Sequence, residues 1–200
     1  MIETKFTAAI LSNCRIYGIS AWKVEFLGKR RIELAEEVLA LFYQVRDAIE
    51  AIRSSFGYEG EGKTRKPGPN EKPEHKNALD QAYVLIERYN RHAEVFSRLH
   101  ALRYRFMAQF GTDASTPFDD LNRLINELLL AARRKARLAM VPERSLQSEA
   151  ALEKHHQEWL EIERVYYNSG DENDPIAPKR VKIISTIEST CRLILESRDR

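Results

Sequence analysis

The chain is poor in the residues that build cross-links and β-sheets. Its 200 residues include only two cysteines, Cys14 and Cys191, which lie far apart and form no Cys-x-x-Cys motif. Two reduced thiols are expected, with a single disulfide as the alternative. The few glycines and prolines fall mostly at stops between helical stretches, and no stretch alternates like a strand. These absences argue against a disulfide-rich or β-rich protein.

A strong net charge is also missing. The formal net charge is +2, although 31% of the residues are charged, so the overall balance does not predict nucleic-acid binding. The charges are unevenly spread. Residues 1–31 hold six basic and two acidic residues, whereas residues 143–174 hold three basic and nine acidic ones. The 43% apolar content is enough for one domain with a sizeable core.

The most apolar N-terminal stretch, Phe6–Trp22, falls short of a membrane span. A spanning helix needs about 20 apolar residues, and this stretch is shorter and carries Arg15 near its middle. We predict a packed or interfacial helix over residues 1–27, amphipathic or membrane-proximal, with a true span and a disordered segment as the alternatives. The residues expected nearest the membrane are Trp22, Lys23, Lys29, Arg30 and Arg31.

Apolar residues at steps of three and four predict long helices from residue 29 onward. Gly28 is expected to break or kink the chain, and Gly57 is expected to end the helix that follows. A second helix is predicted from Pro73 to Phe110, with a length of roughly 50 Å. The two helices are expected to pair as an antiparallel hairpin.

Cap residues predict the starts of three further helices, at Thr116, Ser145 and Asp174. Residues 58–74 are rich in Gly, Pro and Lys, a composition typical of a mobile connection. The predicted fold class is therefore all-α. It is an antiparallel bundle of long helices over residues 28–200, with a short N-terminal helix and one flexible Gly/Pro-rich linker.

Histidine and glutamate supply the candidates for a metal site. Di-iron bundles use paired Glu-x-x-His motifs on inward helix faces, and this chain has one such spacing, from Glu153 to His156. His92 and His100 lie near the apolar stripe of the predicted second helix. A metal-dependent enzyme that uses these four residues is one alternative function. We favour surface or core-edge histidines, and we expect no cofactor.

Two patterns could bind phosphate. Gly57–Thr64 matches the Gly-x-x-x-x-Gly-Lys-Thr spacing of a P-loop, but an amphipathic helix precedes it and prolines follow it, so we do not favour a nucleotide site. A predicted helix also carries a dense group of basic residues, namely Arg133, Arg134, Lys135 and Arg137. Binding of nucleic acid by this basic face is a second alternative. We favour its pairing with the acidic helix predicted at 149–163. A protein that binds single-stranded nucleic acid is expected to interleave aromatic residues with its cations, and these are absent here.

Segments spread over most of the chain carry a family resemblance. They include Ile19–Lys23, Tyr43–Ile49, Gly60–Arg65, Ala82–Tyr89, Tyr104–Met107 and Pro117–Asn122. In these segments the chain resembles a family of short uncharacterised bacterial proteins, whose members often have one membrane-spanning helix before the Trp-Lys region. The resemblance implies a bacterial source and a membrane-proximal start, and it implies no activity and no site residues.

No catalytic set can be assembled from the spacing of serine, cysteine, histidine and acidic residues. We therefore expect a non-enzymatic helical interaction or scaffold protein in the cytoplasm. Its expected partners are another protein or a second copy of the chain, together with an anionic membrane surface. If it contacts the membrane, the protein is expected to be peripheral to the inner membrane or anchored in it. Nucleic acid is not an expected partner.

Overall fold

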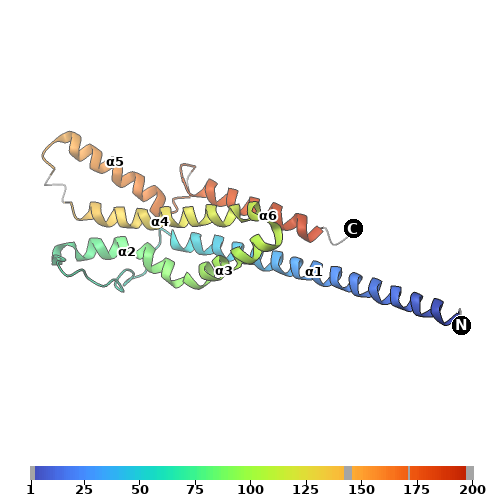
Figure 1. Cartoon of the computed structure of the whole chain (residues 1–200). Coiled ribbons are helices and arrows are strands. Elements are labelled where there is room, and N and C mark those ends of the chain that lie inside the picture. Colours follow the sequence, from blue (N-terminus) through green and yellow to red (C-terminus); the bar gives the residue numbers. More distant parts are fainter. Residues whose placement is uncertain (1–2, 142–145, 171, 197–200) are drawn as a thin grey trace.

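The computed structural model of the chain is a bundle of long α-helices (Figure 1). It describes residues 3–141, 146–170 and 172–196, and only the backbone of residues 3–21, 23 and 24. The helices in these ranges are α1 (Glu3–Ile52), α2 (Lys76–Arg91), α3 (Ala93–Phe110), α4 (Thr116–Ala139), α5 (Glu149–Tyr166) and α6 (Ala177–Glu196). Short 3₁₀ turns, η1 (Pro73–His75) and η2 (Thr112–Ser115), precede α2 and α4. The described residues contain no strand, and the predicted all-α bundle is confirmed.

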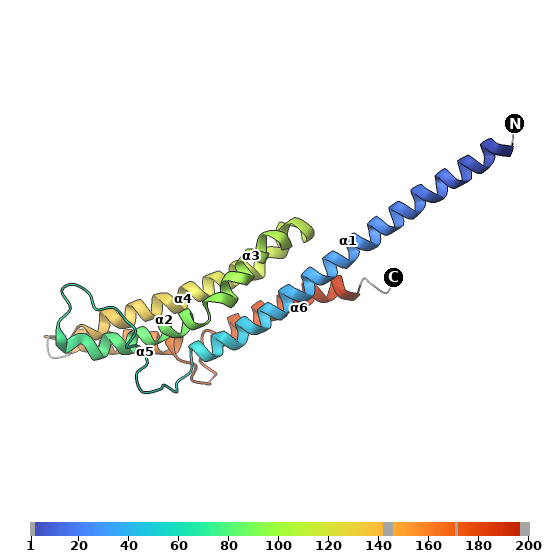
Figure 2. The same ribbon diagram turned by 90° about the horizontal axis from the view of Figure 1, so that it is seen from below.

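The helices run up and down along one direction. The chain goes one way in α1, returns through α2 and α3, goes back in α4 and returns again through α5 and α6 (Figures 1 and 2). α1 packs mainly on α3 and α6, whereas α2 and α5 pack on α4. α6 also packs on α4. The bundle therefore has two halves, and α4 runs through both.

Aromatic and aliphatic side chains of α1, α3 and α4 form the centre of the core. The ring of Phe118 in α4 lies 5.0 Å from that of Phe42 in α1 and 5.5 Å from that of Phe106 in α3, between centroids. The buried residues of α1 recur at steps of three and four, as the sequence predicts. Cys191 is a buried free thiol. The side chain of Cys14 lies outside the described residues, so the expectation of two reduced cysteines stays a prediction.

α1 passes through Gly28 without interruption, so the predicted break at this glycine is wrong. A glycine inside a helix costs only about 1 kcal/mol relative to alanine, which the long helix on both sides can absorb. Leu34 is the first buried side chain of α1 among those described, and Trp22, Phe26 and Leu27 are exposed. The N-terminal part of α1 extends beyond the other helices in both views (Figures 1 and 2).

Two other predicted helix limits are also wrong. The helix expected to end at Gly57 ends at Ile52, because Arg53 is held by contacts to α5 and the turn before α6. The predicted continuous helix Pro73–Phe110 breaks at His92, where φ is −101° and ψ is 8° and the backbone N–H bonds to the carbonyl of Tyr89. The break lets α2 pack on α4 while α3 packs on α1.

Two helix starts are fixed by side-chain caps. The carboxylate of Asp174 accepts hydrogen bonds from the backbone N–H groups of Ile176 and Ala177, at 2.8 and 3.4 Å, in the turn that begins α6. This agrees with the predicted cap. α5 is capped by Ser148, whose Oγ accepts from the N–H of Ala151 at 3.2 Å. The predicted cap, Ser145, lies outside the described residues.

Candidate functional site

The projecting part of α1 carries an exposed aromatic–cation ladder. Trp22, Phe26 and Arg30 follow at intervals of four residues, which places them on one helix face. The rings of Trp22 and Phe26 stack with centroids 5.5 Å apart and planes 17° apart. The guanidinium carbon of Arg30 lies 5.1 Å from the centroid of the Phe26 ring. Trp22 is 64% exposed and Phe26 is 43% exposed, so this Trp22–Arg30 ladder meets solvent.

The other predicted membrane-proximal cations are distributed around the ladder. Lys29 is exposed, with its Nζ 4.0 Å from the carboxylate of Glu33. Arg31 is also exposed but turns toward the bundle, where its guanidinium carbon lies 5.1 Å from the ring centroid of Phe110. The side chain of Lys23 lies outside the described residues. Phe26 was absent from the predicted set, although its spacing of four from Trp22 was a usable signal.

The apolar stretch at the start of α1 does not reach the length and hydropathy of a membrane span. Among the described residues, no helix is long and apolar enough to cross a membrane. Arg15 and the polar residues around it lower the hydropathy of this stretch.

The connection from residue 58 to 74 contacts α2 through a buried carboxylate. Glu61 accepts two hydrogen bonds from Arg88, at 2.6 and 3.0 Å, and one from Arg91 at 2.8 Å. The bonds from Arg88 are the main reason why the pKa of Glu61 falls to about 2, against the opposing effect of burial. The guanidinium of Arg88 also donates to the backbone carbonyls of Ser54 and Phe56. Sequence periodicity does not reveal such loop-to-helix pairs, and the predicted mobility of this connection stays a prediction.

Two donors of the P-loop-like pattern Gly57–Thr64 bond to a carboxylate of the chain itself. Glu87 accepts from the backbone N–H of Gly62 at 2.7 Å and from the hydroxyl of Thr64 at 2.9 Å. A Cβ on Gly62 would lie 2.0 Å from the carbonyl oxygen of Asp80, so this glycine serves close packing on α2. Two of the donors that a P-loop would offer to a phosphate are therefore already used within the chain.

The structure separates the metal-site candidates over several elements. Glu153 and His156 belong to α5, His100 belongs to α3, and His92 is the residue between α2 and α3. In residues 3–141, 146–170 and 172–196 there is no group of three or more His, Cys, Asp or Glu side chains that could hold a metal ion. The candidates are thus not brought together into a metal-binding set.

The basic face of α4 is partly buried against α5. Lys135 is 5% exposed, and its Nζ lies 3.2 Å from the carboxylate of Glu163. The same Nζ lies 4.4 and 4.3 Å from the ring centroids of Tyr166 and Tyr167. Arg133 and Arg137 are exposed, and Arg134 is half-buried. One of the four cations, Lys135, therefore forms an ion pair with the acidic helix, as the favoured interpretation of the sequence predicts.

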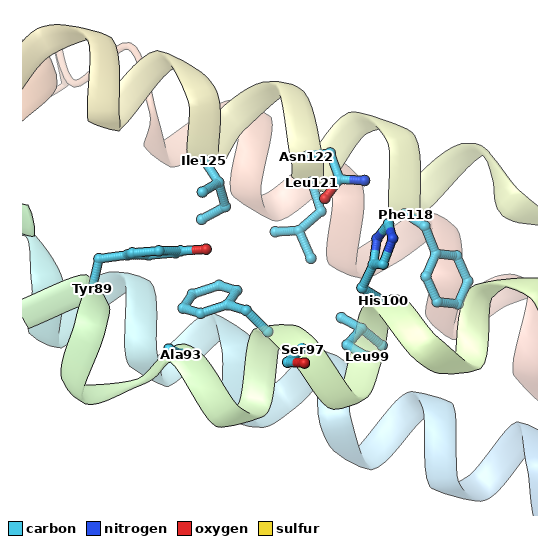
Figure 3. A pocket seen from close by; sticks show the side chains of 10 residues that line it. Tyr89, Ala93, Ser97, Leu99, His100, Phe118, Leu121, Asn122 and Ile125 are labelled. Carbon is cyan, nitrogen blue, oxygen red and sulfur yellow. The ribbon is translucent and has the colours of Figure 1, made fainter.

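A recess of about 270 Å³ opens between the α2–α3 break and α4 (Figure 3). Its floor is apolar and consists of the buried residues Leu99, Phe118, Leu121 and Ile125. Its rim is exposed and consists of Ala93, Ser97, His100 and Asn122. The rings of Tyr89 and Phe96, with centroids 5.0 Å apart and planes 32° apart, form one wall. The sequence does not identify these residues as a group, because they come from three helices.

Comparison with known proteins adds no relative. The chain matches no protein-family model, no curated protein and no solved structure. The class that the fold and its sites define is an all-α bundle with a projecting N-terminal helix segment, and the resemblance to a bacterial family stays a prediction.

Proposed function

We propose that this protein is a helical interaction or scaffold protein that docks on an anionic membrane surface through the projecting part of α1. The observation that carries the proposal is the Trp22–Arg30 ladder, which combines two stacked, exposed aromatic rings with a cation on one helix face. Tryptophan prefers the headgroup level of a bilayer, where its ring is apolar and its N–H can still bond. Cations beside it are attracted by anionic lipids.

The sequence of the projecting segment supports the same proposal. Phe6–Trp22 carries only one charged residue, Arg15, and most of its other residues are apolar or small. A helix that is apolar on most sides is stable when another apolar phase or protein covers it. The remaining helices do not cover this segment in either view of the molecule (Figures 1 and 2). At the surface of a membrane, the apolar residues can leave water while the cations that follow them contact anionic headgroups.

The test is co-sedimentation of the full-length protein with phosphatidylcholine vesicles that contain or lack phosphatidylserine. We expect binding only to the anionic vesicles and its loss in high salt. Replacing Lys29 and Arg30 together by glutamate should weaken binding by at least about thirtyfold, because each cation near the surface contributes about 1 kcal/mol. Trp22→Ala should weaken binding as well, by removing the aromatic anchor.

Matched controls separate this surface from general charge and hydrophobicity. Replacing the exposed Arg133 and Arg137 of α4 by glutamate changes the net charge by the same amount and should leave vesicle binding unchanged. Tyr58→Ala removes an aromatic residue that is 78% exposed and should also have no effect. Equal loss in the two double variants, or equal binding to vesicles without phosphatidylserine, would overturn the proposal.

A further inference from the structure

The recess between α2, α3 and α4 is a second site whose chemistry is independent of the projecting helix. It exists because the chain breaks at His92: α2 packs on α4, and α3 turns to pack on α1. The wall and floor of the recess come from both sides of this break and from the facing side of α4 (Figure 3). An opening with an apolar floor and a polar rim is the usual arrangement of a small-molecule site.

The polar side chains of the recess are those of Tyr89, Ser97, His100 and Asn122. Figure 3 shows the hydroxyl of Tyr89 directed into the space between the helices, with His100 and Asn122 at the opposite end. The lining residues include no Lys, Arg, Asp or Glu. A charged ligand would therefore lose hydration without gaining an opposite charge, whereas a hydroxyl or amide group could bond to these side chains.

The shape of the recess favours a flat ligand. The neighbouring rings of Tyr89 and Phe96 form one wall. The aliphatic side chains of Leu121 and Ile125 on α4 lie across the recess from Tyr89 (Figure 3). A planar ring system can contact both surfaces at once and remove apolar area from water, at roughly 25 cal/mol per Å². The volume of about 270 Å³ lies just below the range of drug-sized sites, which suits one or two fused rings.

We infer that this recess binds an uncharged, flat molecule of one or two rings that carries one hydroxyl or amide group. The ring system lies between the aromatic wall and α4, and the polar group meets Tyr89 at one end or His100 and Asn122 at the other. This inference does not depend on membrane docking, since none of the lining residues belongs to α1.

The test is a calorimetric titration of the full-length protein with 2-naphthol. We expect saturable binding of one molecule per chain below about 1 mM. The anion 2-naphthalenesulfonate, which has the same rings, should bind at least tenfold more weakly because no Lys or Arg lines the recess. Tyr89→Phe removes the hydroxyl at one end, and Asn122→Leu removes the amide at the other end, where His100 remains. The double variant should reduce the affinity for 2-naphthol while leaving that for naphthalene unchanged.

A blocking variant and its matched control locate the site. Ser97→Phe adds a ring at the exposed rim of the recess and should abolish binding of 2-naphthol. Ala101→Phe adds the same ring one turn further along α3, at an exposed residue outside the recess, and should leave binding unchanged. Circular dichroism of both variants confirms that the helices are intact. Absence of saturable binding, equal binding by Ser97→Phe and Ala101→Phe, or equal affinity for the sulfonate would each overturn the inference.

Discussion

Arg53 and Asp174 lie 121 positions apart in the sequence and form a bidentate ion pair, with N–O distances of 2.8 and 2.9 Å. Both are almost fully buried, at 1% and 4% exposed. The guanidinium of Arg53 also donates to the backbone carbonyls of Arg164, Val165 and Tyr167, so it joins the end of α1 to the end of α5. Burial alone would raise the pKa of Asp174, but the bonds from Arg53 and from the backbone outweigh it and lower this pKa.

Removing one partner of this pair should be strongly destabilising. Arg53→Ala leaves the carboxylate of Asp174 buried without its counter-ion, together with several unbonded carbonyls. We expect the free energy of unfolding to fall by about 3–5 kcal/mol. Urea titrations followed by circular dichroism measure the change. The control is Arg46→Ala, which breaks the exposed pair with Asp47 and should cost no more than about 1 kcal/mol. Similar losses in the two variants would show that burial adds nothing to the pair.

The stability of the fold should depend on pH through Glu61. Its pKa is about 2 in the folded chain and about 4.3 in an unfolded one. Because the folded pKa is the lower one, the contribution of Glu61 is complete above about pH 4.3 and is lost as the pH falls toward about 2. Glu61→Gln should therefore make the free energy of unfolding less dependent on pH within this window. The exposed neighbour Glu59 provides the control, since Glu59→Gln should leave the wild-type pH dependence intact.

Two glycines of the same connection should respond differently to alanine. Gly60 has φ +94° with no heavy atom within 4 Å of an added Cβ, whereas Gly62 has φ +82° and would place its Cβ 2.0 Å from the carbonyl oxygen of Asp80. Both substitutions incur the left-handed strain of roughly 1–2 kcal/mol. Gly62→Ala must also push the connection away from α2, and we expect it to cost at least about 1 kcal/mol more than Gly60→Ala in urea titrations. Equal losses would mean that the close approach to Asp80 is not important for stability.

The predicted helices show that apolar periodicity predicts buried faces better than single glycines predict helix ends. The apolar steps of three and four on α1 and α4 identify faces that are buried in the structure, because such side chains leave water together. On α6 the pattern holds only in part, since Ile187 and Cys191 are buried but Val181 is 63% exposed. Gly111, with φ +91°, ends α3 where the sequence predicts a stop. Gly28 does not end a helix, because a single glycine costs only about 1 kcal/mol in a helix interior, and Gly57 lies beyond the end of α1 at Ile52.

The candidate sites differ in how far apart their residues lie in the sequence. The Trp22–Arg30 ladder lies within one helix, and its tryptophan and its cation, Arg30, could be predicted, although Phe26 was missed. The recess of Tyr89, Phe96 and α4 could not, because it arises from a helix break and from side chains of three helices. The metal candidates had suitable chemistry but lie on separate elements in the structure.

By itself, the sequence determined the helical class, most of the buried faces and the basic, aromatic start of the chain, because these follow from local periodicity and composition. Tertiary structure decided the break at His92, the end of α1 at Ile52 and the binding of residues 58–74 to α2. Each of these is a compromise between the helix propensity of a segment and contacts to a distant one. Breaking a buried ion pair such as Arg53–Asp174 costs about 3–5 kcal/mol, whereas local propensity amounts to less than about 1 kcal/mol per residue for most residues.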